Sequence, residues 1–119
     1  MSKVNKVKTG AVILADIPYH KDNPHVHSGM HYYIIVSNSK CCQFSPVVHA
    51  LPLSSNCNRK LPTQVEVSCK SLPRRSFALA EQLTLLPKNA LEEGKLCGYL
   101  ENESMEKVHS AIKIQLALD

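Results

Sequence analysis

Four histidines fall within twelve residues in the first third of the chain, and their side chains are the best suited to proton transfer or metal binding. Imidazole has an unperturbed pKa of about 6.5, and it is also the commonest protein ligand for zinc and its relatives. Loop spacing of this kind is unspecific, and no convincing fourth partner accompanies it, so we expect no metal and no other cofactor. A small metal-binding regulatory domain is the third of our hypotheses. The four residues are His20, His25, His27 and His31.

A second candidate region is the polar, basic loop from Ser54 to Leu61. Its cations, Arg59 and Lys60, could contact phosphates, because basic loops bind a nucleic-acid backbone without reading its sequence. Cys57 lies in the same loop, but nothing adjacent argues for a nucleophilic thiol. Each cation alone is more often a solvated surface charge, and the same holds for Lys70, Arg74 and Arg75.

The elements that must position these residues read mainly as strands. Apolar residues alternate with period two, and β-branched residues are frequent, over most of the first hundred residues. Six strands at this spacing predict a small, strongly curved antiparallel sheet or barrel. The long connection Tyr19–Met30 carries three of the histidines, and long loops in compact domains are usually functional or mobile. The strands are expected at Val12–Asp16, His31–Ser37, Val47–Leu53, Thr63–Ser68, Phe77–Gln82 and Lys95–Leu100.

The carboxyl end changes period and predicts an amphipathic helix over Asn102–Leu118 that packs on the sheet. Asn102 or Ser104 is expected as its N-cap. A second helical turn is expected at Pro87–Leu91, because proline at the first helical position gives up an N–H that would be unpaired anyway. The apolar residues at helical spacing are Met105, Val108, Ile112 and Leu116.

Length and composition favour a single domain that spans residues 1–119. The chain is 44% hydrophobic and 20% charged, which fits one compact core. Its net charge of +4 permits an anionic partner without requiring one. The five cysteines are an odd number without a CxxC pair, so reduced thiols of a cytoplasmic protein are the better interpretation. No stretch approaches the ~20 apolar residues that span a bilayer, so we expect no membrane partner.

Several segments, spread over nearly the whole chain, match the motifs of one protein family in the right order. The run from Ser45 to Val67, SPVVHALPLSSNCNRKLPTQVEV, looks like the pattern SPxxxxxPLTS…KLPTxVEV. The other matches are Gly10–Asp16 to GxVxxADL, His25–Asn38 to a segment with GxRPVVVVSN, Glu81–Leu83 with Pro87–Lys88 to EQIRTIDKxRL, and Ile112–Leu118 to a last helix. Together these segments resemble the MazF/PemK/Kid family of toxin endoribonucleases.

The resemblance implies an SH3-like small antiparallel β-barrel with a C-terminal amphipathic helix, usually a homodimer. It implies the toxin component of a type II toxin–antitoxin system, a metal-independent endoribonuclease that cuts single-stranded RNA such as mRNA at a short sequence. Attack by the 2′-hydroxyl would leave a 2′,3′-cyclic phosphate and a 5′-hydroxyl. The resemblance also implies a cognate antitoxin whose flexible tail occupies the RNA groove.

The resemblance places His31 where the family has its signature Arg, and Ser54 where the family has Thr; these are the expected catalytic residues. Serine keeps the hydroxyl. Imidazole loses the fork that guanidinium lays on two phosphate oxygens, but it is a better proton shuttle. Two outcomes stay open. His31 acts as general acid or base, with His25 or His27 as the second proton-transfer group, or the protein is a catalytically weakened module that binds RNA or an antitoxin-like peptide.

Further residues are expected to contact the RNA. Tyr32 could stack on a base, with a place in the barrel wall as the alternative. Glu81 and Gln82 could orient the RNA, or could hold the fold as a hydrogen-bond pair. His49 alternates with apolar neighbours, so we expect it to pack in or beside the core. The expected RNA-binding residues are His25, His27, Tyr32, Ser55, Arg59, Lys60, Glu81 and Gln82.

Overall fold

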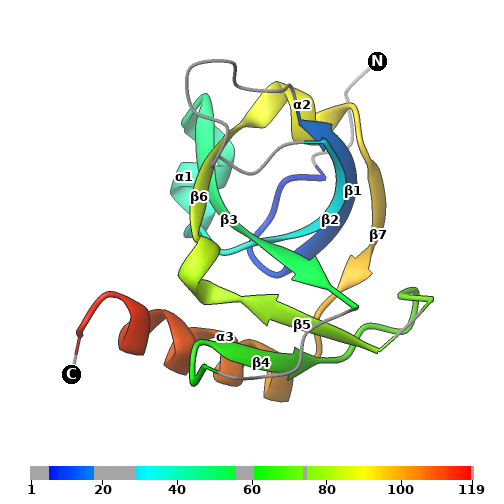
Figure 1. The fold of residues 1–119 in the computed structure, drawn as a ribbon. Coiled ribbons are helices and arrows are strands. Elements are labelled where there is room, and N and C mark those ends of the chain that lie inside the picture. The colour runs from blue at the N-terminus through cyan, green and yellow to red at the C-terminus, as the bar shows by residue number, and fades with distance from the viewer. Residues whose placement is uncertain (1–5, 18–28, 56–60, 74, 119) are drawn as a thin grey trace.

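The fold is mainly antiparallel β-structure, as the alternation of apolar residues predicts. A computed structural model describes residues 6–17, 29–55, 61–73 and 75–118. Within them, a seven-stranded sheet curls into a barrel-like shape, with helices at its ends and on one side (Figure 1). The elements are β1 (Ala11–Ile17), β2 (Gly29–Ile35), α1 (Ser39–Phe44), β3 (Val47–Ser54), β4 (Gln64–Val67), β5 (Ser76–Leu79), the 3-10 helix η1 (Ala80–Gln82), β6 (Thr84–Pro87), α2 (Lys88–Glu92), β7 (Lys95–Tyr99) and α3 (Asn102–Gln115).

Strand β3 is the hub of the sheet. The strands follow the order β4-β5-β3-β2-β1-β7, and β6 pairs with β3 off this path. The first half of β3, Val47–Ala50, pairs with β6, and its last two residues pair with β5. Between them, Ala50–Pro52 pairs with β2. Because one strand serves three neighbours in succession, the sheet bends sharply and brings the end of β3 toward the β4–β5 hairpin.

Two apolar clusters fill the two faces of this curved sheet. One lies inside the curl of β1, β2, β3 and β6, and its largest fully buried side chain is Tyr33. The second lies between the opposite face of β1–β3 and the layer formed by β4, β5 and α3 (Figure 1). Val12, Ile34 and Leu51 belong to this second cluster, while residues beside them in sequence belong to the first: Ala11, Ile13, Tyr33, Ile35 and Ala50. The central strands are therefore buried on both sides, which explains their nearly continuous apolar sequences.

Helix α1 was not anticipated, although its start carries a recognisable signal. The Asn38 side chain accepts a hydrogen bond from the Cys41 backbone N–H at 2.9 Å, as an N-cap residue does. Strand β6 was also missed, because Thr84–Pro87 is short and contains leucines on both faces. The predicted strand Phe77–Gln82 is wrong beyond Leu79, because the 3-10 helix η1 begins there.

Helices α2 and α3 confirm the two predicted helical segments. The predicted N-caps of α3 are wrong: the cap position is Glu101, and no side chain caps the helix there. Ser104 is instead buried, and its hydroxyl accepts a hydrogen bond from the Ser68 N–H at 2.9 Å. The helix ends at Gln115, and Ala117 beyond its cap has a φ of 57°, with hydrogen bonds from the Ala117 N–H to the Ile114 carbonyl and from the Leu118 N–H to the Lys113 carbonyl. This is the pairing of a Schellman motif.

The amino-terminal segment is tied to the turn after α2. The Lys6 ammonium donates hydrogen bonds to the carbonyls of Glu92 and Gly94, at 3.1 and 2.8 Å. A cation at a helix carboxyl end satisfies carbonyls that have no partner within the helix. None of the described helices is long and apolar enough to cross a membrane.

Candidate functional site

A cavity of about 300 Å³ lies at the end of the sheet that holds His31. Three of its walls come from segments that are far apart in sequence: β2, the end of β3, and the connection from β4 into β5. The cavity thus combines an imidazole, a phenol and two hydroxyl groups with apolar side chains. Its lining residues are Leu14, Met30, His31, Tyr32, Leu53, Ser55, Pro73 and Ser76.

His31 is held by the pairing of β2 with β1. Its Cα lies opposite that of Ala15, and its side chain is half-buried. Its ring meets the ring of Tyr33 edge to face, with centroids 6.1 Å apart and planes at 78°. Tyr33 has no exposed surface, and burial raises the pKa of its phenol to about 12, with a further contribution from the Asp16 carboxylate. A rigid, neutral ring therefore supports the imidazole from inside the barrel.

Ser54 and Ser55 end up in different places. Ser54 is the last residue of β3, half-buried, with its Cα opposite that of Phe77 on β5. Ser55 follows the strand, is exposed, and lines the cavity with His31. The last β2–β3 pair is Tyr33 with Pro52, so His31 and Ser54 each lie two residues beyond it. Side chains two residues apart along a strand share a face, which places both on the same side as this last pair.

Tyr32 has both of the surroundings that its sequence position suggested. Its ring lines the cavity, and it is also half-buried against the apolar cluster beneath β4 and β5. The structure thus leaves room for base stacking while showing that Tyr32 forms part of the barrel wall.

Glu81 has hydrogen-bond partners within the fold. Its two carboxylate oxygens accept from the Thr63 hydroxyl at 3.0 Å and from the Gln64 side-chain amide at 2.7 Å. These contacts tie η1 to the start of β4, directly after the basic loop. Gln82 is exposed, and neither residue lines the His31 cavity. Their expected contact with RNA remains a prediction.

Several expected site residues lie outside the described part of the chain. His25 and His27 belong to the first connection, and Arg59 and Lys60 to the basic loop. The metal hypothesis depended on the same connection. Among the residues that the structure describes, no group of three His, Cys, Asp or Glu side chains could hold a metal ion.

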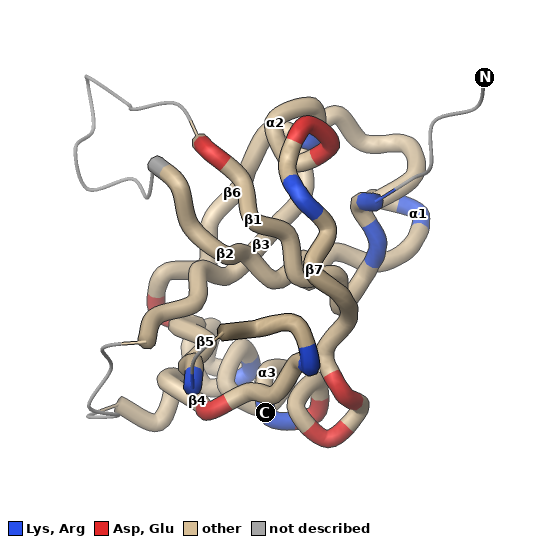
Figure 2. The backbone as a smooth tube through the Cα atoms, turned by 90° about the vertical axis from the view of Figure 1, so that its right-hand side faces the viewer, with Lys and Arg blue, Asp and Glu red and all other residues tan. Residues whose placement is uncertain are grey.

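The charges near His31 bear on how phosphate could be held. Asp16 lies near the described end of β1, where Figure 2 shows acidic colouring, and the neighbouring described end of β2 contributes no Lys or Arg. Arg75, an expected phosphate contact, forms a bidentate pair with Glu66, at 2.6 and 3.0 Å, and lies 5.2 Å from the centre of the Phe77 ring. Arg75 is thus already paired within the fold, and the expected phosphate contacts of the basic loop, Arg59 and Lys60, lie outside the described residues.

His49 is not where the alternation of β3 placed it. Its side chain is exposed, opposite Leu85 of β6, rather than packed in or beside the core. The prediction failed because β6 was missed: the outer face of the β3–β6 pair carries exposed apolar residues as well as His49. Among the residues that alternate with His49, Leu51 and Leu53 are buried but Val47 is 36% exposed, so the buried stretch of this face ends before His49.

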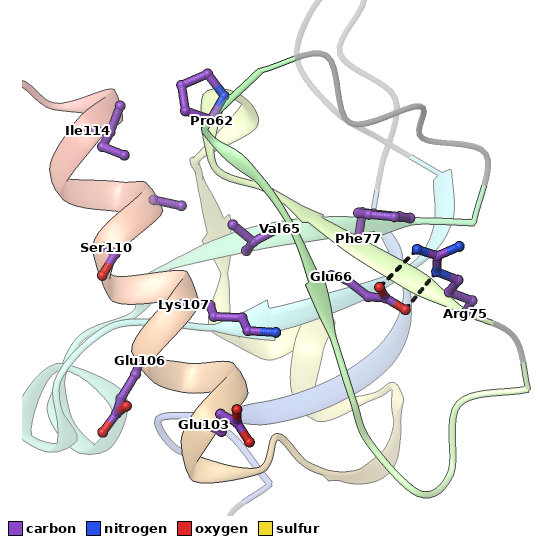
Figure 3. A pocket seen from close by; sticks show the side chains of 11 residues that line it. Pro62, Val65, Glu66, Arg75, Phe77, Glu103, Glu106, Lys107, Ser110 and Ile114 are labelled. Atoms are coloured by element: carbon purple, nitrogen blue, oxygen red, sulfur yellow. Dashed lines mark hydrogen bonds and ion pairs between the residues drawn. The ribbon is translucent and has the colours of Figure 1, made fainter.

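A larger groove of about 790 Å³ runs between α3 and the β4–β5 hairpin (Figure 3). Val65 and Phe77 project from the strands, and Lys107 reaches from the helix toward β4. Glu66, Glu103 and Glu106 line the groove together with only two cations, so its charge does not favour a polyanion. It shares no lining residue with the His31 cavity.

Pro73 and Ser76 are two of the five cavity residues that sequence reasoning missed; the others are Leu14, Met30 and Leu53. Ser76 is buried at the first position of β5, and Pro73 lies in the connection before it. The signal for either was weak, since a serine before an apolar strand and a proline in a turn are common features of any chain. Only the β4–β5 pairing shows that this connection comes back to His31.

The sequence matches one family model and several relatives. The model describes a PemK-like, MazF-like toxin of type II toxin–antitoxin systems, and it matches residues 8–116. Endoribonuclease MazF of Staphylococcus saprophyticus is 34% identical over 115 residues, which cover 94% of this chain and 92% of the relative. Endoribonuclease EndoA of Bacillus subtilis is 33% identical over 118 residues, covering 94% and 96%.

Solved structures share the fold. An endoribonuclease from a mycobacterial species, in complex with its cognate antitoxin, superposes with a TM-score of 0.76 at 25% identity and covers 94% of this chain and 96% of its own. MazF from Deinococcus radiodurans reaches a TM-score of 0.76 at 13% identity, covering 92% and 96%. The barrel-like fold is therefore shared by proteins with as little as 13% sequence identity to this chain.

Proposed function

This chain belongs to the PemK-like, MazF-like family of toxins of type II toxin–antitoxin systems, and from that premise we propose that it is an endoribonuclease that cuts single-stranded RNA. Two relatives at 34% and 33% identity carry the name endoribonuclease. The observation in the structure that best supports this function is the cavity in which the His31 imidazole and the hydroxyls of Ser55 and Ser76 line a common space.

The proposed reaction needs no metal, because the substrate supplies its own nucleophile. The ribose 2′-oxygen forms a bond to phosphorus while the bond to the leaving 5′-oxygen breaks, giving a 2′,3′-cyclic phosphate and a 5′-hydroxyl. Two protons must move: one leaves the 2′-hydroxyl and one reaches the 5′-oxygen. We assign one of these transfers to His31 and the other to His25 or His27, with the Ser54 hydroxyl donating a hydrogen bond to the phosphate.

The surroundings of His31 suit a proton-transfer group better than a phosphate clamp. The ring is half-buried and is supported by Tyr33, so its orientation is restricted. Imidazole cannot replace the two-pronged contact of guanidinium with phosphate oxygens. In our proposal, phosphate is held instead by the basic loop with Arg59 and Lys60, and Tyr32 offers a stacking surface for a base.

A catalytically weakened binding module is the second candidate function. It is favoured by the absence of Lys and Arg from the described ends of β1 and β2 that flank His31. Without a guanidinium there, the charge that develops on the phosphoryl oxygens has less compensation. Such a protein would still hold RNA or an antitoxin-like peptide without cutting it.

We further propose that the protein acts in the cytoplasm as a homodimer that a cognate antitoxin inhibits. The mycobacterial endoribonuclease above was solved with its antitoxin, which supports such a partner here. The exposed apolar side chains of Val47 and Leu85 on the outer face of β3 and β6, with that of Phe44 at the end of α1, are compatible with a second copy of the chain.

The test is incubation of the purified protein with a long single-stranded RNA in excess EDTA. We expect discrete fragments whose 5′ ends accept phosphate from a polynucleotide kinase without prior dephosphorylation, as 5′-hydroxyl ends do. Their 3′ ends should resist periodate until the cyclic phosphate is opened and removed. RNA binding without cleavage would favour the second candidate, and activity lost only on chelation would favour the metal hypothesis.

A further inference from the structure

Two cysteines that are 28 positions apart in sequence, Cys69 and Cys97, lie in one corner of the fold. Cys69 opens the connection between β4 and β5, and Cys97 belongs to β7. Both side chains are half-buried, and both pack against the same apolar cluster. Neither is part of the His31 cavity, and both are free thiols.

The turn that begins at Cys69 lies directly on β7. The turn is closed by a hydrogen bond from the Leu72 N–H to the Cys69 carbonyl at 3.1 Å. An ideal Cβ at Gly98 would lie 3.1 Å from the Cys69 sulfur and 3.6 Å from the Ser71 hydroxyl oxygen. The sulfur therefore touches the strand at the residue next to Cys97, in space that the missing Gly98 side chain leaves open.

A β-bulge turns Cys97 toward the same side. Gly98 lies opposite Val12 and Leu96 lies opposite Ile13, so Cys97 is the extra residue of the bulge. Leu96 packs against the cluster inside the barrel, whereas Cys97 packs with Cys69 against the other cluster. Gly98 has a φ of 150°, a conformation that side-chain-bearing residues rarely adopt. Cys97 thus packs on the side of the sheet that carries Cys69, where its thiol donates to the Lys95 carbonyl of its own strand at 3.6 Å. The open space of Gly98 faces the Cys69 sulfur directly.

We propose that Cys69 and Cys97 form a reversible disulfide when the protein meets a low-molecular-weight disulfide such as oxidised glutathione. One protein thiolate attacks a sulfur of the small disulfide, which gives a mixed disulfide and releases one small thiol. The second protein thiolate then attacks the protein sulfur of that mixed disulfide and releases the second small thiol. Two protein thiols are oxidised, one small disulfide is reduced to two thiols, and the two protons end on those thiols.

The cross-link would join two parts of the fold that hold the cavity wall. The connection from Cys69 leads to Pro73 and Ser76, which both line the cavity with His31. The start of this connection is already tied to α3, since the Ser68 N–H donates to the Ser104 hydroxyl oxygen at 2.9 Å. A bond to β7 would fix this connection at its start. This consequence for cleavage rests on the proposed function, whereas the formation of the cross-link does not.

The chain contains its own control thiols. Cys41 is exposed on α1, and burial raises the pKa of the neighbouring Cys42 thiol, which donates to the Ser37 carbonyl at 3.4 Å. Trypsin, which cuts after Lys and Arg, separates these from the proposed pair. Leu61–Lys70 contains Cys69 alone, Leu96–Lys107 contains Cys97 alone, and the other three cysteines share the peptide Cys41–Arg59.

The test treats the full chain with oxidised glutathione, blocks remaining thiols with N-ethylmaleimide, and maps tryptic peptides without reductant. We expect Leu61–Lys70 joined to Leu96–Lys107, lost on addition of dithiothreitol and absent from Cys97→Ser. The melting temperature of the oxidised wild type should exceed that of the reduced protein by roughly 5 °C or more. The same treatment should leave the melting temperature of Cys97→Ser unchanged.

The cross-link is overturned if Cys41 has become glutathionylated while Cys69 and Cys97 carry only maleimide or separate glutathione adducts. Cys69→Ala repeats the comparison if Cys97→Ser fails to fold. For the effect on cleavage, the oxidised wild type should cut RNA at least threefold more slowly than the reduced protein, and Cys97→Ser should be insensitive. An unchanged rate in fully cross-linked protein overturns the coupling to the cavity. A reduced protein that never cuts RNA overturns the proposed function and leaves the cross-link standing.

Discussion

The imidazole of His31 meets the phenol ring of Tyr33 edge to face, with ring centroids 6.1 Å apart. The two residues are two positions apart on β2, so their side chains share the face that looks into the barrel. Tyr33 is fully buried and cannot move aside, whereas His31 is half-buried at the mouth of the cavity. The tyrosine therefore restricts the ring orientations that are open to the histidine.

We expect His31→Ala to lower RNA cleavage by about 10² or more, because a positioned proton-transfer group contributes at least that factor. The melting temperature should change little, since the side chain lies at the end of the sheet. His49→Ala is the matched control: it removes an exposed imidazole from a neighbouring strand and should cut at the wild-type rate. Cleavage by His31→Ala at the wild-type rate would show that His31 has no part in the chemistry.

His31→Arg separates proton transfer from charge stabilisation. Arginine stays charged and supplies a phosphate fork, but it cannot accept a proton. If His31 transfers a proton, His31→Arg should cut RNA more slowly than the wild type although it restores the phosphate fork. A rate above wild type in His31→Arg would instead identify the natural chain as an attenuated enzyme.

Tyr33→Phe should remove a pH dependence of stability. Burial raises the pKa of Tyr33 to about 12 in the folded protein, against about 10 in the unfolded chain, so the folded state keeps its proton longer. This contribution is fully present below pH 10 and is lost as the pH rises toward 12. Between these limits the free energy of unfolding should fall by about 1 to 2 kcal/mol more in the wild type than in Tyr33→Phe.

Urea unfolding at several pH values measures that difference. Tyr99→Phe is the control, because Tyr99 is 46% exposed on β7 and should keep the wild-type pH dependence. If the free energy of unfolding fell equally with pH in the wild type and in Tyr33→Phe above pH 10, the loss of stability at alkaline pH could not be assigned to Tyr33.

Sequence alone predicted the barrel and its long helix, because both depend on periodicity. Strands β2, β3 and β4 have regular apolar alternation or frequent β-branched residues, and they were expected at these places. Strand β6 could not be predicted from periodicity, because Leu85 and Leu86 give no alternation. Only its pairing with β3 makes Thr84–Pro87 a strand. Helix α1 was missed for a different reason, because its six residues are too few to show a helical period.

The cavity was only half predictable. The family resemblance pointed to His31 and Ser54, and the Ser54–Leu61 loop drew attention to Ser55. Which of the two serines lines the cavity with His31 depends on where β3 stops pairing with β2 and begins to pair with β5. This change of partner has no local signal in the sequence. The contribution of Pro73 and Ser76 depends on a β4–β5 pairing that is equally nonlocal.

We expect Glu81→Ala to lower the free energy of unfolding by about 1 to 3 kcal/mol, because it leaves the Thr63 hydroxyl and the Gln64 amide without the carboxylate that they contact. Thr63 is only 6% exposed, so water cannot readily replace the lost acceptor. Glu106→Ala, at an exposed position of α3, should stay within about 0.5 kcal/mol of wild type. Wild-type stability combined with a raised KM for RNA would show that Glu81 contacts the substrate instead.

Gly94→Ala should damage both stability and cleavage, although Gly94 lies outside the His31 cavity. A Cβ at this position would lie 2.6 Å from the Leu14 carbonyl oxygen and 3.0 Å from the Ala15 Cβ, so the turn after α2 and strand β1 would have to move apart. Ala15 is the Cα partner of His31, and a shift of β1 therefore reaches the cavity through the β1–β2 pairing. We expect a loss of about 1 to 3 kcal/mol in the free energy of unfolding and slower cleavage by the protein that stays folded.

The matched control is Gly10→Ala. Its Cβ would meet only the Met105 side chain, at 3.7 Å or more, and its cost comes from a φ of 85° rather than from a clash. That cost is about 1 kcal/mol, and it falls on a residue that has no contact with the cavity. The rate of RNA cleavage per folded molecule should therefore drop in Gly94→Ala and stay at the wild-type value in Gly10→Ala. Equal rates in the two variants would mean that the position of β1 does not control the geometry of His31.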